Sequence, residues 1–153
     1  MLAAPRQQLP SIEEHLRETG ITVQRLAVSY AFHSRWIDPA ATRCCDMLRN
    51  VQWRKPQLPL LCCAQAGALD AVDADSFWRA ARRPIRFRDT IAALERRGSF
   101  HYIDVGPAGT LATFLKYALP PSSASTVQPL LTPAGQDLKN LQNLSLEALQ
   151  HTA

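Results

Sequence analysis

Apolar residues alternate with small or polar ones along residues 26–33, which read LAVSYAFH. Alternation with a period of two is typical of a β-strand with one buried face, and it predicts a strand over residues 21–30. The run stops at His33, and the next residue is Ser34, which carries a hydroxyl group. Folds commonly present catalytic side chains where a strand ends, and an imidazole can act there as the general base for a serine nucleophile. A structural or solvent-facing histidine is the alternative interpretation of this segment alone.

The rest of the chain divides into helical and extended segments by its apolar period and by its proline and glycine residues. Helices are expected over residues 11–19, 40–50, 75–81, 87–97, 110–119 and 135–150. Further strands are expected over residues 58–63, 100–105 and 127–131. In the fifth of these helices we expect Leu111, Phe114 and Leu115 to point inward. Asp38 is expected to cap the second helix, with Pro39 in its first turn.

Composition is ordinary for a soluble globular protein, with 153 residues of which 46% are hydrophobic and 20% are charged. The formal net charge is +4, and arginines cluster over residues 79–97. The cluster is interpreted either as a solvated helix face or as a docking surface for an acidic carrier protein or the phosphates of coenzyme A. Nucleic acid is not an expected partner, because the cluster has little aromatic interleaving and no recognised reader motif.

The four cysteines form two adjacent pairs, at residues 44–45 and 62–63. Adjacent cysteines rarely bridge each other and this spacing matches no zinc motif, so we expect reduced thiols, no metal site and a cytoplasmic protein. The first residues are too short and too interrupted by proline for a secretory signal. No apolar run approaches the roughly 18 residues of a membrane-spanning helix, so no membrane association is expected.

A second segment, residues 100–111, reads FHYIDVGPAGTL and predicts a strand, a glycine–proline turn and a helix. Residues 78–94 contain WR, RRPIRF and TIAAL in that order, and TP stands at residues 132–133. Together, over residues 11–145, these motifs resemble the acyl-CoA:acyl-carrier-protein transacylases, which comprise malonyl transacylases and the acyltransferase domains of polyketide synthases. Residues 109–117 are most similar to the discrete acyltransferases that serve polyketide synthases in trans.

The resemblance implies an α/β fold of two parts. Residues 34–150 would form the C-terminal part of the acyltransferase core, which is α/β-hydrolase-like and has a parallel sheet. Residues 1–33 would form half of a ferredoxin-like small subdomain, whose last strand delivers His33. The family also carries its serine nucleophile in a sharp G-H-S-x-G turn. No two of the six glycines here are four residues apart, so the chain is interpreted as a C-terminal half that has the base, lacks the nucleophile and is inactive alone.

The resemblance also assigns roles around the histidine. His33 is the expected catalytic base, and the family holds the other ring nitrogen with a backbone carbonyl that falls at or next to Arg86. Tyr30, Phe32 and Ser34 are the expected substrate-binding residues. In polyketide acyltransferases, a phenylalanine directly before the histidine, here Phe32, accompanies malonyl substrates, because its ring would exclude an α-methyl group. A tyrosine at the position of Tyr30 is commoner in the enzymes that use methylmalonyl. Packing in the core is the alternative interpretation of both rings.

The implied reaction is transfer of a malonyl-type acyl group from coenzyme A to the phosphopantetheine thiol of an acyl carrier protein, in polyketide or fatty acid biosynthesis. The acyl-CoA thioester is a substrate, and no bound cofactor is expected. The expected partners are the carrier protein and an N-terminal half that carries the serine. An acyl hydrolase that clears carrier proteins needs the same serine and histidine, and it stays open as an alternative. A non-catalytic truncated remnant, or one half of a split enzyme, is the second alternative.

Overall fold

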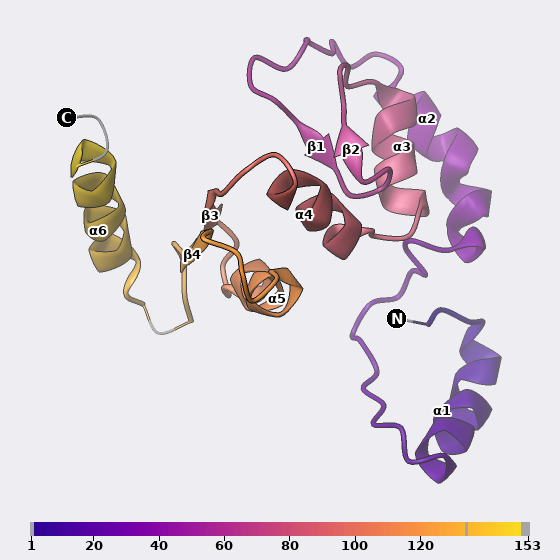
Figure 1. Cartoon of the computed structure of the whole chain (residues 1–153). Helices are drawn as coiled ribbons and strands as arrows, with labels where there is room; N and C mark the ends of the chain where they lie inside the picture. Colours follow the sequence, from indigo (N-terminus) through magenta and orange to yellow (C-terminus); the bar gives the residue numbers. More distant parts are fainter. Residues whose placement is uncertain (1, 134, 151–153) are drawn as a thin grey trace. The chain divides into compact units, whose positions relative to one another are not determined.

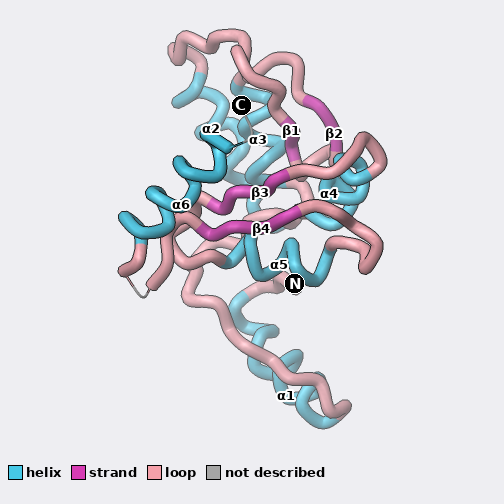
Figure 2. Tube along the Cα trace, turned by 60° about the vertical axis from the view of Figure 1, so that its left-hand side comes forward, coloured by secondary structure: helices cyan, strands magenta, loops and turns pink. Residues whose placement is uncertain are grey.

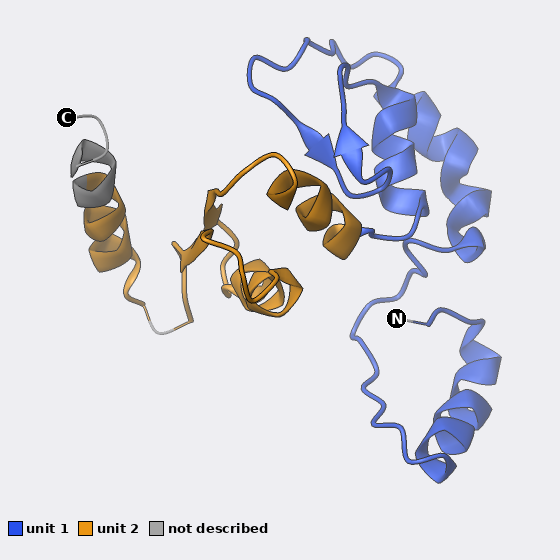
Figure 3. Ribbon diagram, viewed as in Figure 1, with its two compact units in different colours: residues 1–86 blue, residues 87–153 orange. Residues whose placement is uncertain are grey.

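A computed structural model describes residues 2–133 and 135–150 of the chain (Figure 1). The chain divides into two compact units, Met1–Arg86 and Phe87–Ala153, which are described in turn (Figure 3). This division differs from the boundary between residues 33 and 34 that the resemblance implies, and that boundary stays a prediction. No helix among the described residues is both long and apolar enough to cross a membrane.

The first unit is mainly helical over its described residues. In chain order its elements are η1 (Arg6–Gln8), α1 (Leu9–Glu18), η2 (Arg35–Ala40), α2 (Ala41–Leu48), β1 (Leu61–Cys62), β2 (Gly67–Ala68) and α3 (Ala74–Arg82), where η marks a 3-10 helix. A proline stands in the first turn of α1, and the helix stops before Gly20, which takes a φ of +78°. The helices expected over residues 11–19, 40–50 and 75–81 are confirmed, with ends that differ by a few residues.

The strand expected over residues 21–30 is wrong. This segment is a loop, and no strand of the described residues pairs with it. Its alternating apolar side chains are exposed, with Leu26 at 54%, Val28 at 62% and Tyr30 at 68% of their full area. Hydrogen bonds to a neighbouring strand make an alternating segment into a strand, so the pattern alone could not produce one here.

The strand expected over residues 58–63 is much shorter than predicted. Only β1 forms, and it pairs antiparallel with β2 in a small hairpin. Leu58 is 80% exposed, and Pro59 has no N–H to donate to a ladder. Parallel pairing of this segment, which the family likeness implied, is therefore absent from the described residues.

α3 begins and ends for local reasons. Asp73 caps it, because Asp73 Oδ1 accepts the backbone N–H of Ser76 at 2.7 Å while Ser76 Oγ accepts that of Asp73 at 2.8 Å. The helix stops at Arg82, because Pro84 forces the preceding Arg83 into an extended conformation with ψ of +151°. α2 and α3 lie side by side, and η2 contacts both helices (Figure 1).

The second unit is built around one parallel pair of strands. Its elements are α4 (Phe87–Glu95), β3 (His101–Asp104), α5 (Thr110–Ala118), β4 (Thr126–Pro129) and α6 (Asp137–Gln150). β3 and β4 run parallel in a register that pairs His101 with Thr126, and α5 connects them (Figure 2). The elements expected over residues 87–97, 100–105, 110–119, 127–131 and 135–150 are thus confirmed, and so is parallel pairing for this part of the chain.

The glycine–proline turn between β3 and α5 forms as predicted, and a buried carboxylate holds it. Asp104 is 4% exposed, and its two oxygens accept the backbone N–H groups of Gly106 at 2.9 Å and Ala112 at 2.8 Å. Gly109 stands at the N-cap of α5 with a φ of +60° and has no side chain to cap the helix. Asp104 therefore supplies from the end of β3 the cap that α5 lacks.

Few apolar side chains are covered. In α5, Ala112 and Leu115 are buried, at 3% and 5% of their full area. Leu111 at 48% and Phe114 at 52% are exposed, so the inward orientation is confirmed for Leu115 and wrong for Leu111 and Phe114. Further large apolar side chains are open to solvent, among them Tyr117 at 81% and Leu138 at 78% of their full area. Much apolar surface of the described residues is therefore exposed.

Candidate active site

His33 lies where the loop from α1 meets η2, in the first unit. Its backbone has a φ of +61°, a left-handed conformation that costs a residue with a side chain about 1–2 kcal/mol. Its N–H donates to the carbonyl of Ala81, near the end of α3, at 2.8 Å. Residues kept in this region of backbone conformation need such support from their surroundings, and they are concentrated at functional sites.

The ring of His33 has a defined orientation. Its Nδ1 lies 3.0 Å from the backbone oxygen of Arg83, and a carbonyl oxygen only accepts hydrogen bonds, so Nδ1 carries the proton of the neutral ring. Nε2 then bears the free lone pair. The side chain is half-buried, so this lone pair can meet a substrate or a hydroxyl group from another segment. A neutral imidazole held in this tautomer is competent as a general base.

The carbonyl at His33 belongs to Arg83, and its assignment to Arg86 was wrong. The restriction that Pro84 places on Arg83 explains the difference, because the extended Arg83 takes its carbonyl out of the helical direction of α3. The backbone N–H of Arg86 instead donates to the carbonyl of Cys63 at 2.9 Å. Pro84, two residues before Arg86, was the sequence signal that could have located the carbonyl.

An ion pair that the sequence did not predict lies beside these contacts. Arg82 donates from Nη2 to Asp38 Oδ2 at 3.1 Å and from Nε to Asp38 Oδ1, so both ends of the carboxylate are held. The hydrogen bond from Arg82 lowers the pKa of Asp38 and the same contact raises the pKa of Arg82. Asp38 lies inside η2 and pairs across to α3, so its expected role as the cap of α2 is wrong.

Ser34, expected to bind substrate, makes two local hydrogen bonds. Its Oγ donates to the carbonyl of Ala31 at 2.7 Å and accepts the N–H of Trp36 at 3.2 Å, which makes it the N-cap of η2. The hydroxyl thus closes the turn that follows His33. A direct role toward substrate stays a prediction.

Of the two rings expected to bind substrate, Phe32 lies next to the histidine ring and Tyr30 lies next to Phe32. The Phe32 ring lies 6.5 Å from the ring of His33 and 6.1 Å from that of Tyr30, the second pair in an edge-to-face arrangement. Phe32 is 43% exposed and Tyr30 is 68% exposed. Neither ring is packed in a core among the described residues, so the alternative interpretation of them as core aromatics does not hold there.

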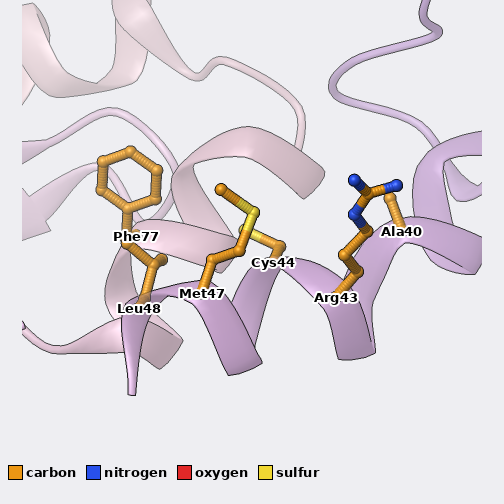
Figure 4. Close-up of a pocket in the computed structure, with 6 residues that line it drawn as sticks. All are labelled: Ala40, Arg43, Cys44, Met47, Leu48 and Phe77. Carbon is orange, nitrogen blue, oxygen red and sulfur yellow. The ribbon is translucent and has the colours of Figure 1, made fainter. Parts of the chain in front are cut away.

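A separate apolar hollow of about 280 Å³ lies between α2 and α3 (Figure 4). Its lining residues are Ala40, Arg43, Cys44, Met47, Leu48 and Phe77. His33 is not among them, so the hollow is distinct from the histidine site. The four cysteines are free thiols, and no three His, Cys, Asp or Glu side chains of residues 2–133 and 135–145 gather as metal ligands.

The geometry defines a class of site: a neutral imidazole oriented by a backbone carbonyl, on an α/β fold, with aromatic rings beside it. No protein-family model matches the chain. In sequence the chain is 38% identical over 144 residues to the polyketide biosynthesis acyltransferase homolog PksD of Bacillus subtilis. The alignment covers 94% of this chain and 44% of PksD. The chain is 31% identical over 148 residues to the polyketide biosynthesis protein ThaF of Burkholderia thailandensis, over 95% of this chain and 13% of that protein.

Solved structures agree with the sequence relatives. The acyltransferase domain from the second module of the salinomycin polyketide synthase superposes with a TM-score of 0.77 at 25% identity, over 92% of this chain and 33% of that one. The malonyl CoA-acyl carrier protein transacylase of Clostridium perfringens superposes with a TM-score of 0.71 at 21% identity, over 94% of this chain and 45% of that one. The fold is therefore part of an acyltransferase fold. Sequence and fold agree, and the chain is related to the polyketide acyltransferases, although it spans less than half the length of the curated relatives it matches.

Proposed function

We propose that this chain contributes the general base of an acyltransferase that moves a malonyl-type acyl group from coenzyme A to the phosphopantetheine thiol of an acyl carrier protein. The observation that carries the proposal is the contact between His33 Nδ1 and the carbonyl of Arg83. It leaves Nε2 unprotonated in the neutral ring and stabilises the imidazolium that forms when Nε2 takes a proton. PksD and the salinomycin synthase domain, which are acyltransferases by name, support the choice of acyl transfer among the reactions a histidine base serves.

In the proposed mechanism Nε2 removes the proton of a serine hydroxyl as the serine oxygen attacks the thioester carbonyl. The carbon–sulfur bond breaks, and the imidazolium returns the proton to the departing coenzyme A thiolate. In the second half, Nε2 takes the proton of the phosphopantetheine thiol, whose sulfur attacks the serine ester. The serine oxygen leaves and recovers the proton from His33.

We infer that the serine comes from a segment outside this sequence, because no G-x-S-x-G occurs in it. The surface supports a missing neighbour. In the first unit, the loop over residues 21–30 exposes its apolar side chains. In the second unit, Ile103 is 42% exposed, and Leu111 and Phe114 are 48% and 52% exposed. Exposed apolar side chains gathered in this way within each unit are typical of interaction surfaces. A neighbouring segment that carries the serine explains that surface better than a solitary remnant does.

We further propose that Phe32 and Tyr30 form a wall of the acyl pocket, with Ser34 shaping the turn below it. The phenyl ring beside the imidazole would exclude an α-methyl group on the acyl chain, which favours malonyl over methylmalonyl. Hydrolysis in place of transfer would use the same serine and the same histidine. The name of the Clostridium perfringens neighbour, a malonyl CoA-acyl carrier protein transacylase, favours the carrier-protein thiol as acceptor.

Complementation tests the proposal. The chain is co-expressed with the part of Bacillus subtilis PksD that lies outside the aligned region, and transfer of labelled malonyl from malonyl-CoA to a carrier protein is measured. We expect activity with both pieces and none with either alone, because removal of the serine of a serine–histidine pair costs on the order of 10⁶ in turnover. His33→Ala should lower the activity at least about 10²-fold.

His15→Ala is the matched control, because His15 lies exposed on α1. It should leave transfer unchanged. Equal activity of the His33→Ala and wild-type complexes would overturn the base assignment. A labelled ester formed on the 153-residue chain alone would overturn the supply of the nucleophile by another segment.

A further inference from the structure

Three consecutive residues at the end of α3 hold the segment that carries His33. The carbonyl of Ala81 accepts the His33 N–H at 2.8 Å, and the carbonyl of Arg83 binds the ring at 3.0 Å. Between them, the side chain of Arg82 binds the carboxylate of Asp38, five residues after the histidine. The backbone contacts act on His33 itself, and the ion pair acts on the far end of the same turn.

The turn between His33 and Asp38 is stiff enough to transmit that restraint. Ser34 Oγ ties the carbonyl of Ala31 to the N–H of Trp36, and Ile37 at the centre of η2 is 8% exposed. The N–H of Ile37 also donates to the carbonyl of Ser34 at 3.4 Å. Because these hydrogen bonds join residues 31 to 37, we expect a displacement of Asp38 to be passed along the turn to His33. Without Arg82, His33 would be held to α3 by its own two hydrogen bonds alone.

We propose that the ion pair between Asp38 and Arg82 is a positioning element for His33, which keeps the imidazole against the carbonyl of Arg83 and so favours the tautomer of the neutral ring with its proton on Nδ1. This inference rests on the proposed role of His33 as a base. The guanidinium of Arg82 donates to both carboxylate oxygens of Asp38, and such two-point contacts fix the relative orientation of the two groups as well as pairing their charges. The hydrogen bonds of this pair join η2 to α3 and do not involve the His33 ring, so the pair is expected to act through the position of the histidine.

The exposure of the pair separates a positioning role from a purely structural one. The Asp38 side chain is 52% exposed and that of Arg82 is 30% exposed. Exposed ion pairs contribute little to folding stability. Loss of the pair should therefore leave the fold intact and change mainly the orientation and tautomer of the ring.

The test reads the tautomer directly by long-range ¹H–¹⁵N correlation NMR on the 153-residue chain with ¹⁵N-labelled histidine, at a pH where the rings are neutral. His33→Gln assigns the signals. In the wild type we expect the form with the proton on Nδ1 to predominate. Asp38→Asn should lower the ratio of the Nδ1–H to the Nε2–H form about 5-fold, the effect of weakening one hydrogen bond.

The matched control is Asp46→Asn, which breaks another exposed ion pair of the same unit, between Asp46 Oδ1 and Arg49 Nη2 at 2.6 Å, with no contact to the turn. It should leave the ring of His33 unchanged. The charge-swapped double variant, Asp38→Arg with Arg82→Asp, should restore the wild-type ratio.

Equal ratios in wild type and Asp38→Asn would overturn the inference, and so would unfolding of Asp38→Asn by circular dichroism, since that would make the pair a structural element. Failure of acyl transfer in the complementation assay would leave the tautomer result intact. The two proposals therefore fail separately.

Discussion

Replacement of Asp104 by asparagine should destabilise the second unit strongly for so small a change. The carboxylate accepts two backbone N–H groups, from Gly106 and Ala112, with a different oxygen for each. Asparagine has one acceptor oxygen, so its NH₂ group must face one of these donors. A buried donor left without an acceptor costs about 1–3 kcal/mol, which corresponds to a fall in melting temperature of roughly 5–20 °C for a unit of this size.

Asp137→Asn is the matched control, because Oδ1 of Asp137 accepts a single N–H, that of Thr132, at 3.0 Å. Asparagine keeps one acceptor oxygen for that donor, so the melting temperature should change by less than about 4 °C. Thermal unfolding followed by circular dichroism measures both variants, and amide hydrogen exchange at Gly106 and Ala112 locates the effect. Equal melting temperatures for the two variants would refute the claim that Asp104 holds the turn with both oxygens.

Two further predictions concern acid stability and acyl specificity. Glu95 accepts hydrogen bonds from Ser123, Tyr102 and Ser125, which lower its pKa below the ordinary 4.5, so its contribution to stability is complete above pH ~4.5 and is lost as the pH falls through the lowered pKa. The melting temperature should therefore fall less steeply between pH 6 and pH 2.5 for Glu95→Gln than for the wild type. An equal fall of the melting temperature in both proteins would contradict this. In the complemented enzyme, Phe32→Ser should keep malonyl transfer and raise methylmalonyl transfer about 10–200-fold. Competition between the two labelled thioesters measures the ratio, and an unchanged preference would remove Phe32 from the pocket wall.

Local signals in the sequence were enough for most helices and for the turn after β3. Capping residues, prolines and glycines act within a few positions, so the places of α1, α3, α4 and α5 could be predicted without tertiary information. The loop over residues 21–30 shows the limit. Its alternation is genuine, but a strand also needs a partner, and the described residues offer none.

The candidate site was predictable in part. The resemblance singled out His33, and in the structure the Phe32 ring lies beside it with the Tyr30 ring next to Phe32. The carbonyl of Arg83 could not be read from side-chain identity, because every residue has a carbonyl, although Pro84 restricts which one leaves the helix. Asp38 and Arg82 lie 44 residues apart in the chain, and only folding reveals that their charges meet.

At position 33, the residue that best fits the left-handed backbone differs from the residue that the proposed chemistry needs. Glycine and asparagine adopt a φ of +61° with less strain than histidine does, so the fold by itself would favour them there. A selection for thermal stability alone would drift toward those residues and remove the imidazole. Consensus or stability-guided redesign of this chain should therefore hold residue 33 fixed, because the substitution that most easily relieves the backbone strain would remove the proposed base.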